Sequence, residues 1–242
     1  MPIVLLVRHG RTTANATGIL AGWATGVGLD EVGAAAATEV GRRLAEAGMP
    51  VARLVSSPLP RCLATAEAIR QELGPVEVTT HDGLAECRYG SWSGQPLAEL
   101  AKDPLWKVVQ EQPSAVRFPD GELPGESMAS MAARAIAAIR EVDAEVAHAH
   151  GESAVWVAVS HGDVIKAILA DAAGCHLDAF QRFVVDPASM SAVRYTPARP
   201  YVLRVNDTGG NLASLVPKAP DATAEADAAT TSHDAVVGGG AG

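Results

Sequence analysis

Short apolar runs alternate with longer helical patterns along this 242-residue chain. Such alternation is typical of an α/β protein, in which helices connect the strands of a mostly parallel sheet. The apolar runs predict strands at residues 3–7, 54–56, 76–79, 155–159, 192–195 and 202–205. Helical periodicity predicts helices at residues 30–47, 61–73, 127–147 and 163–173, with Asp30 as an N-cap and Gly48, Gly74 and Gly174 as stop signals.

Two stretches do not fit this alternation. Residues 92–125 are interrupted by five prolines, so they cannot form one continuous helix, and they are too long for an ordinary connection. We interpret this stretch as a lid. From residue 218 the sequence has almost no large apolar side chain, so it cannot bury enough surface to fold. We therefore expect one folded domain over residues 1–217 and a disordered low-complexity tail over residues 218–242.

The composition supports a single compact domain, since 48% of the residues are hydrophobic and 19% are charged. The formal net charge of −9 argues against nucleic acid or an anionic membrane as a partner, because either would require a surplus of Lys and Arg. No basic segment leads into a long apolar stretch at the N-terminus, and no stretch approaches bilayer length. We therefore expect a cytoplasmic protein. The sequence does not indicate an oligomeric state.

The cysteines and most of the histidines do not form a metal-binding pattern. Cys62, Cys87 and Cys175 are far apart with no C-x-x-C pair, which favours reduced thiols over a disulfide framework or a zinc site. His148 and His150 lack carboxylate or cysteine neighbours at ligand spacing, and we interpret them as a solvated helix end. We predict no metal site.

Three of the apolar runs end in polar clusters. Because the carboxyl ends of parallel strands meet at one edge of an open α/β sheet, these clusters can lie together although they are distant in sequence. Two arginines and two histidines would then share one pocket. The clusters are Arg8-His9-Gly10, Ser56-Ser57 with Arg61, and Ser160-His161-Gly162.

These residue types suit a phosphoryl group. Arg8 and Arg61 can hold phosphate oxygens by charge-assisted hydrogen bonds, and Gly10 and Gly162 allow close approach of the backbone. Helices beginning after each histidine cluster would aim N–H groups at the anion. His9, kept neutral by neighbouring cations, can attack phosphorus and become phosphohistidine.

Two further groups would complete the reaction. His161 would stabilise the transferring group by hydrogen bonding. Glu86, which follows the strand at residues 76–79, would protonate the leaving alkoxide and later activate water. Trp92 and Trp106 could line the mouth of the pocket.

The stretch "VRHGRTTAN" resembles the Arg-His-Gly signature of the histidine phosphatase superfamily, also called the phosphoglycerate mutase-like family. Other stretches are similar to further elements of that family, in the family's order, over about residues 2–215: "GLDEVGAAAA", "SSPLPRCLATA", "LAECRYGSWSG", "PGES" and "VSHGDVI". The resemblance implies a three-layer α/β/α sandwich and turnover through phosphohistidine without a metal or other cofactor. It implies the following site: His9 as nucleophile, Glu86 as acid, phosphate contacts from Arg8, Arg61 and His161, and a further substrate contact from Asn15.

Departures from the mutase branch of that family favour a phosphatase. Cys87 stands where the mutases have an arginine, and residues 92–125 contain no Arg-Arg pair to hold a substrate carboxylate. We therefore predict a metal-independent phosphomonoesterase acting on a small phosphorylated metabolite. A phosphoglycerate mutase-type enzyme is the first alternative. A phosphate-binding scaffold protein is the second, although binding alone would not require both a nucleophile and an acid.

Overall fold

Six strands form one sheet in the order β3-β2-β4-β1-β5-β6 in the computed structural model, which describes residues 1–210. Strands β1 to β4 are parallel, β5 is antiparallel to β1, and β6 is antiparallel to β5. The predicted mostly parallel sheet is confirmed, and each predicted strand is present. The strands are β1 (Ile3–Arg8), β2 (Val51–Ser56), β3 (Val78–Thr80), β4 (Val155–Ser160), β5 (Met190–Tyr195) and β6 (Pro200–Asp207).

The four predicted helices also form, and local capping explains their ends. Asp30 accepts a hydrogen bond from the Gly33 N–H at 2.7 Å and starts the helix at residue 31. The helices are α1 (Thr13–Ala16), α2 (Glu31–Glu46), α3 (Pro60–Leu73), α4 (Leu97–Leu100), α5 (Pro104–Glu111), α6 (Met128–His150) and α7 (Gly162–Ala172). Short 3₁₀ turns are η1 (Asp82–Leu84), η2 (Gly90–Trp92), η3 (Pro113–Ala115) and η4 (Leu177–Arg182).

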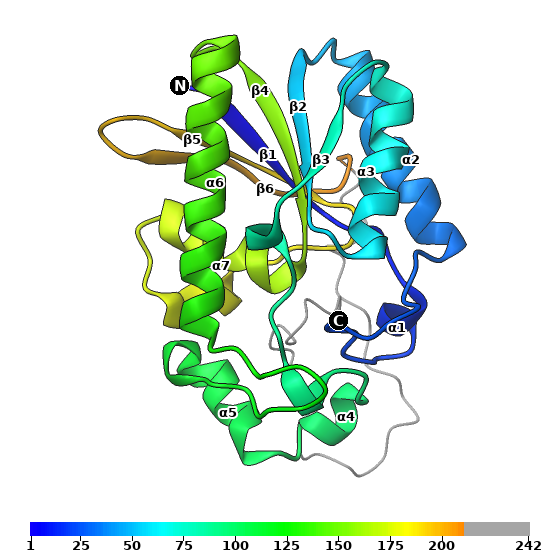
Figure 1. Ribbon diagram of the computed structural model, residues 1–242, viewed down its shortest axis with the longest axis vertical. Helices are drawn as coiled ribbons and strands as arrows, with labels where there is room; N and C mark the ends of the chain where they lie inside the picture. The colour runs from blue at the N-terminus through cyan, green and yellow to red at the C-terminus, as the bar shows by residue number, and fades with distance from the viewer. Residues whose placement is uncertain (211–242) are drawn as a thin grey trace.

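Helices cover both faces of the sheet. Helices α6 and α7 lie on one side, and α2 and α3 lie on the other (Figure 1). Alternate residues of β1 enter the two interfaces: Val4 and Leu6 join the hydrophobic cluster of α6 and α7, whereas Leu5 and Val7 join that of α2 and α3. An unbroken apolar strand is thus required because both of its faces are buried. The predicted three-layer α/β/α sandwich is confirmed.

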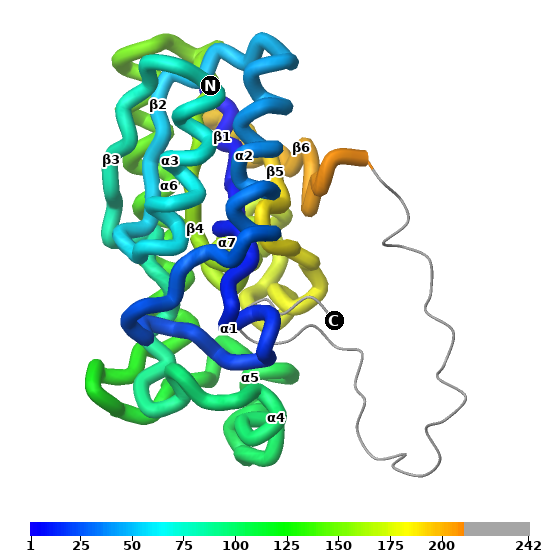
Figure 2. Tube along the Cα trace, turned by 90° about the vertical axis from the view of Figure 1, so that its right-hand side faces the viewer, coloured from blue at the N-terminus to red at the C-terminus, as the bar shows by residue number. Residues whose placement is uncertain are grey.

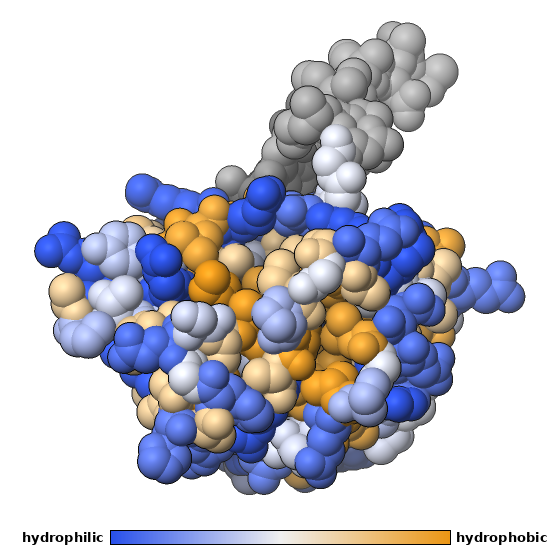
Figure 3. All heavy atoms as spheres, turned by 90° about the horizontal axis from the view of Figure 1, so that it is seen from above, coloured by the Kyte–Doolittle hydropathy of each residue, from blue (hydrophilic) through white to orange (hydrophobic). Residues whose placement is uncertain are grey.

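The carboxyl ends of the parallel strands point towards the end of the molecule that carries α1, α4 and α5 (Figure 2). The opposite end shows hydrophobic residues in the middle and hydrophilic residues around them (Figure 3), as expected where the interfaces between layers reach the surface. No helix within residues 1–210 is long and apolar enough to cross a membrane. The tail predicted at residues 218–242, and the domain boundary before it, lie outside the described residues.

Residues 92–125 fold as short helices joined to the main core. Trp92 is 3% exposed, and its ring packs against Phe118 at 5.4 Å and beside Trp106 at 6.2 Å between centroids. The prediction that Trp92 lines the mouth of a pocket is therefore wrong, because the indole is used for packing. Val109 and Phe118 of the same stretch are buried in the cluster of α6 and α7. These contacts anchor the stretch that we interpreted as a lid.

The loop after β1 is held against the start of α2. A Cβ atom at Gly33 would lie 2.0 Å from the Arg11 carbonyl oxygen, and one at Gly10 would lie 2.3 Å from the Gly33 carbonyl oxygen. The Arg11 side chain also donates to Asp30 at 2.7 Å. Two glycines thus allow backbone-to-backbone contact that fixes the course of the chain beside His9.

We expect Gly33→Ala to lower the free energy of unfolding by roughly 1–3 kcal/mol, because the new methyl group meets backbone that cannot move aside. The better helix propensity of alanine, worth about 1 kcal/mol, works against this loss. Urea unfolding measures the difference. Gly28→Ala is the matched control, since a Cβ atom there meets nothing within 4 Å and the substitution should be close to neutral. Equal stability of the two variants would contradict the packing argument.

Candidate active site

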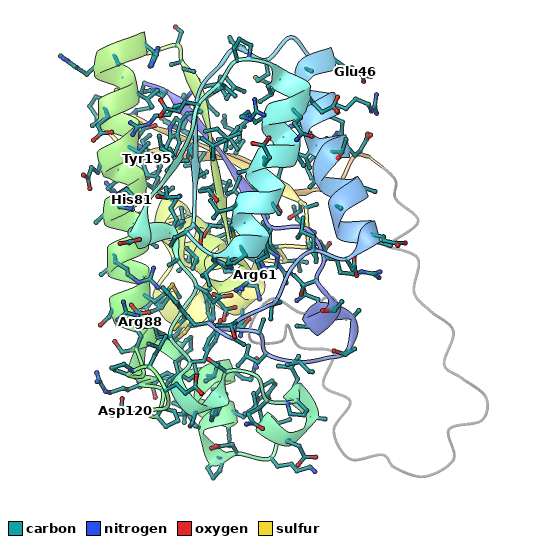
Figure 4. The ribbon with its side chains drawn as sticks, turned by 45° about the vertical axis from the view of Figure 1, so that its right-hand side comes forward. Glu46, Arg61, His81, Arg88, Asp120 and Tyr195 are labelled. Atoms are coloured by element: carbon teal, nitrogen blue, oxygen red, sulfur yellow. The ribbon has the colours of Figure 1, made fainter. Side chains whose placement is uncertain are left out.

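The five charged and imidazole side chains predicted to form a pocket converge at the carboxyl ends of β1 and β4. Arg8 ends β1 and His9 follows it, Arg61 lies in the first turn of α3, Glu86 follows η1, and His161 follows β4. None is more than 3% exposed. Figure 4 shows Arg61 at this end of the sheet. The two imidazole rings are 5.3 Å apart between centroids, and Glu86 Oε2 lies 3.7 Å from Arg61 Nη2 and 3.6 Å from His161 Nδ1.

Backbone hydrogen bonds hold His9 from two strands. Its N–H donates to the Ser160 carbonyl at the end of β4 at 2.9 Å. The Ala188 N–H, just before β5, lies 3.1 Å from the Arg8 carbonyl and 3.2 Å from the His9 carbonyl. Ala188 adopts a φ of 57°, an unusual conformation for a residue with a Cβ atom. His9 is therefore fixed at the point where the parallel and antiparallel parts of the sheet meet.

Arg61 determines which nitrogen of His9 carries the proton. The Arg61 Nε–H donates to His9 Nε2 at 3.2 Å. A guanidinium has only donors, so His9 Nε2 must be the unprotonated nitrogen. His9 Nδ1 then carries the proton and donates it to the Gly10 carbonyl at 2.8 Å. The lone pair of Nε2, which a nucleophile requires, is held at the centre of the cluster.

The same reasoning assigns the tautomer of His161. Arg61 Nη2 donates to His161 Nδ1 at 3.1 Å, so that nitrogen is the acceptor. His161 Nε2 then carries the proton and donates it to the Ser57 hydroxyl at 2.8 Å. Ser57 also lies within reach of the Leu59 N–H at the start of α3. One arginine thus orients both histidines.

Burial and charge keep both rings neutral. Burial lowers the pKa of His9 well below its usual value, and the positive charges of Arg61 and Arg8 lower it further. Burial likewise lowers the pKa of His161, again with contributions from Arg61 and Arg8. A neutral His9 has the free electron pair that attack on phosphorus requires.

The pKa of Glu86 is shifted upwards, in the opposite direction to those of the two histidines. Burial raises the pKa of Glu86 to about 7, and the negative charge of Asp163 adds to the increase, whereas the charge of Arg61 opposes it. The carboxyl is therefore protonated in a substantial fraction of molecules near neutral pH. Its position is set by its own backbone, because the Glu86 carbonyl accepts hydrogen bonds from Trp23 Nε1 at 2.8 Å and Arg134 Nη2 at 3.0 Å.

The cluster has unused capacity to bind an anion. Arg61 Nη1 is buried and has no hydrogen-bond partner in the part of the chain that the structure describes. A buried donor without a partner costs about 1–3 kcal/mol, so a ligand oxygen that accepts from it would gain that amount. The side chain is held in place by Nη2, which also donates to the Gly22 carbonyl at 2.9 Å. Within this part of the chain, no group of three or more metal-ligating side chains is found.

The two helix starts differ from each other. We expected α1 and α7 to aim N–H groups at an anion. Helix α1 is a single turn closed by a capping box, in which the Asn15 N–H donates to the Thr12 hydroxyl and Asn15 Oδ1 accepts from the Thr12 N–H at 3.1 Å. The capping box uses the N–H groups of Thr12 and Asn15, so for α1 the expectation stays a prediction that could apply only to the N–H groups between them. Helix α7 begins after His161 without a side-chain cap.

Asn15 thus has a capping role in α1. Its Oδ1 also accepts from the Thr12 hydroxyl at 2.9 Å. Contact of Asn15 with a substrate stays a prediction.

A cavity of about 470 Å³ lies next to the acid loop, by which we mean residues 85–89 between η1 and η2, which include Glu86. Its walls include Trp23 and Arg88, and the Arg88 guanidinium stacks on the Trp23 ring at 5.6 Å. Residues 93 and 121–123 contribute from the proline-interrupted stretch, and residue 91 lies just before it. Because Trp23 also donates to the Glu86 backbone, this cavity adjoins the loop that carries the carboxyl.

The thiol of Cys62 is close to the site and is unreactive. It lies 3.4 Å from His161 Nε2 and is fully buried. Burial raises the pKa of Cys62 to about 12, so the group stays a thiol at neutral pH. All three cysteines are free.

Comparison with known proteins agrees with this geometry. The sequence model of the histidine phosphatase superfamily (branch 1) matches residues 4–208. This chain belongs to that superfamily. The family predicted from the sequence is therefore confirmed, and with it a phosphoryl-transfer enzyme.

Relatives in this superfamily include phosphatases and mutases. Phosphoserine phosphatase 1 of Hydrogenobacter thermophilus is 31% identical over 207 residues, which are 85% of this chain and 92% of that protein. The metal-independent phosphoserine phosphatase of Arabidopsis thaliana is 34% identical over 167 residues, 68% of this chain and 66% of that protein. A 2,3-bisphosphoglycerate-dependent phosphoglycerate mutase of Methylobacterium sp. is 31% identical over 176 residues, 69% of this chain and 78% of that protein.

The fold also matches a solved structure. The phosphoserine phosphatase of Entamoeba histolytica in complex with 3-phosphoglyceric acid superposes with a TM-score of 0.73 at 25% identity, covering 86% of this chain and 98% of that one.

Sequence reasoning found Arg8, His9, Arg61 and His161 because they end a strand, directly follow one or start a helix. It found Glu86 by its place after a predicted strand, in a stretch that resembles the family. It left Ser57, Tyr89 and Asp163 without roles. The Tyr89 hydroxyl donates to Asp163 at 2.7 Å, and both side chains are fully buried. Tyr89 lies three residues after Glu86, and Asp163 lies two residues after His161. This proximity in sequence was the signal that could have found them.

We expect Arg61→Gln to weaken binding of inorganic phosphate at least about tenfold, since hydrogen bonds to charged groups contribute about 1.5–3 kcal/mol each. Isothermal titration calorimetry measures the dissociation constant. Arg70→Gln in the same helix is the control, because Arg70 is half-buried outside the site and pairs with Glu67. Unchanged phosphate affinity in Arg61→Gln would remove Arg61 from the binding site.

Proposed function

We propose that this protein is a metal-independent phosphatase of small phosphorylated metabolites that works through phosphorylated His9. The observation that carries the proposal is the hydrogen bond from Arg61 to His9 Nε2, which leaves a neutral, oriented imidazole among buried cations. The phosphatase names of several relatives support the same reaction class.

In the first step, the phosphate oxygens of the ester would accept hydrogen bonds from Arg8, Arg61 and His161. Arg61 would exchange its bond to His9 for one to the phosphate, which frees the Nε2 lone pair to attack phosphorus. As the phosphorus–oxygen bond of the ester breaks, Glu86 gives its proton to the leaving oxygen. Asn15 of α1 would contribute a further substrate contact.

In the second step, Glu86 would act as a base. Its carboxylate takes a proton from a water molecule whose oxygen attacks the phosphohistidine, and His9 is regenerated in its neutral form with release of phosphate. The leaving group would occupy the cavity lined by Trp23 and Arg88, next to the acid loop. The free cysteines favour the cytoplasm as its location.

A phosphoglycerate mutase-type reaction is the second candidate, because relatives with that name match this chain at similar identity. A mutase would exclude water from phosphohistidine and return the phosphoryl group to another hydroxyl.

We expect His9→Ala to lower turnover of phosphomonoesters by at least about 10³-fold, since the nucleophile is lost. The assay measures phosphate release in excess EDTA, and the wild type should retain full activity there. His148→Ala, at the exposed end of α6, is the control and should keep wild-type activity. Isomerisation of 3-phosphoglycerate with trace 2,3-bisphosphoglycerate and little phosphate release would establish the mutase instead. Turnover that survives in His9→Ala would contradict the proposed nucleophile.

We expect Glu86→Gln to separate substrates by their leaving groups. Alkyl phosphates need a proton on the departing oxygen, so their turnover should fall about 10²–10⁴-fold. An aryl phosphate with a weakly basic leaving group should still give a burst of product, followed by accumulation of phosphohistidine, because the base of the second step is missing. In the wild type, kcat/KM for alkyl phosphates should decline as the pH rises through about 7, where Glu86 loses its proton. Equal losses for both substrate types would argue against Glu86 as the acid.

A further inference from the structure

Tyr89 lies between two buried carboxyl groups. Its hydroxyl oxygen is 2.7 Å from Asp163 Oδ2 and 3.3 Å from Glu86 Oε1. Tyr89 and Asp163 are fully buried, and Glu86 is 3% exposed. Tyr89 follows Glu86 by three residues in the acid loop, whereas Asp163 comes from the first turn of α7, so the contact joins two elements that are distant in sequence.

The hydroxyl carries one proton and cannot donate fully to both carboxyl groups. The shorter distance indicates that it donates to Asp163. The lone pairs of the Tyr89 oxygen then face Glu86 Oε1, which also accepts from the Cys87 N–H at 3.1 Å. This contact is less unfavourable when Glu86 is a neutral acid with its proton on Oε2 than when Glu86 is ionised. Glu86 Oε2 faces the opposite way, towards Arg61 and His161. The two oxygens of Glu86 therefore have separate tasks, one towards the Tyr89 hydroxyl and one towards the reacting phosphate.

Charged groups of β1, α3, α6 and α7 also act on Asp163 and Glu86. Asp163 interacts electrostatically with Arg8 of β1 and Lys166 of α7, so its negative charge is partly balanced. Burial raises the pKa of Tyr89 well above its usual value, so the phenol stays neutral throughout. The groups that face Glu86 are Arg61 of α3, Arg8 of β1, Arg134 of α6, His161 and Asp163.

We infer that Asp163 and Tyr89 are positioning residues that control the protonation of Glu86 through the two steps. The inference rests on the proposed function. Asp163, by its negative charge, holds Glu86 as a carboxylic acid until the ester bond breaks. When Glu86 has given its proton to the leaving oxygen, the Tyr89 O–H turns from Asp163 to the new carboxylate and keeps its own proton. Water then returns a proton to Glu86 as its oxygen bonds to phosphorus, the nitrogen–phosphorus bond breaks, and Tyr89 turns back to Asp163.

Substitutions of the two residues should shift the midpoint of Glu86 ionisation in opposite directions. Asp163→Asn removes a negative charge and leaves Arg8 and Lys166 less balanced, so the midpoint of Glu86 ionisation should fall by about one pH unit or more. Tyr89→Phe removes the donor that the ionised carboxylate would use. Because hydrogen bonds to charged groups are stronger than those to neutral ones, this midpoint should rise. If Asp163 and Tyr89 had a purely structural role, the two substitutions would not be expected to move the Glu86 midpoint in opposite directions.

The test is a carbon-13 NMR titration of the full-length protein labelled at the glutamate side-chain carboxyl carbon. The Glu86 resonance is the one absent from Glu86→Gln. Each variant is titrated from about pH 5 to pH 9, and the alkaline limb of kcat/KM for an alkyl phosphate should move with the NMR midpoint. Thermal unfolding confirms that each variant is folded. If Asp163→Asn does not fold, Tyr89→Phe alone decides the matter, and its midpoint must rise.

Two matched controls use residues of the same type outside the site. Asp143→Asn alters a buried carboxylate that accepts from Trp156 Nε1 at 3.0 Å, and Tyr195→Phe removes a buried phenol hydroxyl far from Arg61 (Figure 4). Neither should move the Glu86 midpoint. Midpoints that are unchanged in both site variants, or that shift in the same direction, would overturn the inference. A wild type that hydrolyses no phosphate ester would overturn the proposed function instead, and the NMR midpoints would still decide the roles of Asp163 and Tyr89.

Discussion

One guanidinium group governs the arrangement of this site. Arg61 donates to both His9 and His161, and because it can only donate, each ring must present a bare nitrogen towards it. The two tautomers, the neutral state of both rings and the acceptors that each ring requires on its other side follow from this one constraint. Ser57 and the Gly10 carbonyl are placed to accept the remaining ring protons. Within the described residues Arg61 donates its hydrogen bonds only to neutral acceptors, which is costly for a buried cation, and an anionic ligand is the partner that would relieve the cost.

The parts of the fold and site that the sequence predicted share a physical cause. Strands buried on both faces must be apolar throughout, so β1 and β4 are visible as unbroken runs that end at Arg8-His9 and at Ser160-His161. A parallel sheet places such ends together, which makes the meeting of distant motifs predictable without coordinates. The helix stops at Gly48 and Gly74 were equally predictable, because glycine is the residue that most readily adopts a positive φ after a helix. Both glycines have a positive φ in the structure.

The parts that the sequence did not predict depend on which way a side chain faces. Tyr89 and Trp92 lie three residues apart in a loop without periodicity, and nothing in the sequence assigns Tyr89 to Asp163 or Trp92 to the core. The same limitation applies to α1, where a single turn uses Asn15 for its own cap. Side-chain direction in such loops is decided by contacts made after the sheet and helices have packed.

The two hydrophobic clusters of the sandwich lie on opposite faces of the sheet and share no residue. Helix α3, which carries Arg61, belongs to one cluster, and helix α7, which carries Asp163, belongs to the other. A phosphate held by Arg61 beside the N-terminus of α7 would thus link the two outer layers across the sheet. Occupancy of the site would then protect both layers from local opening, so ligand concentration would set how long the whole sandwich resists a protease.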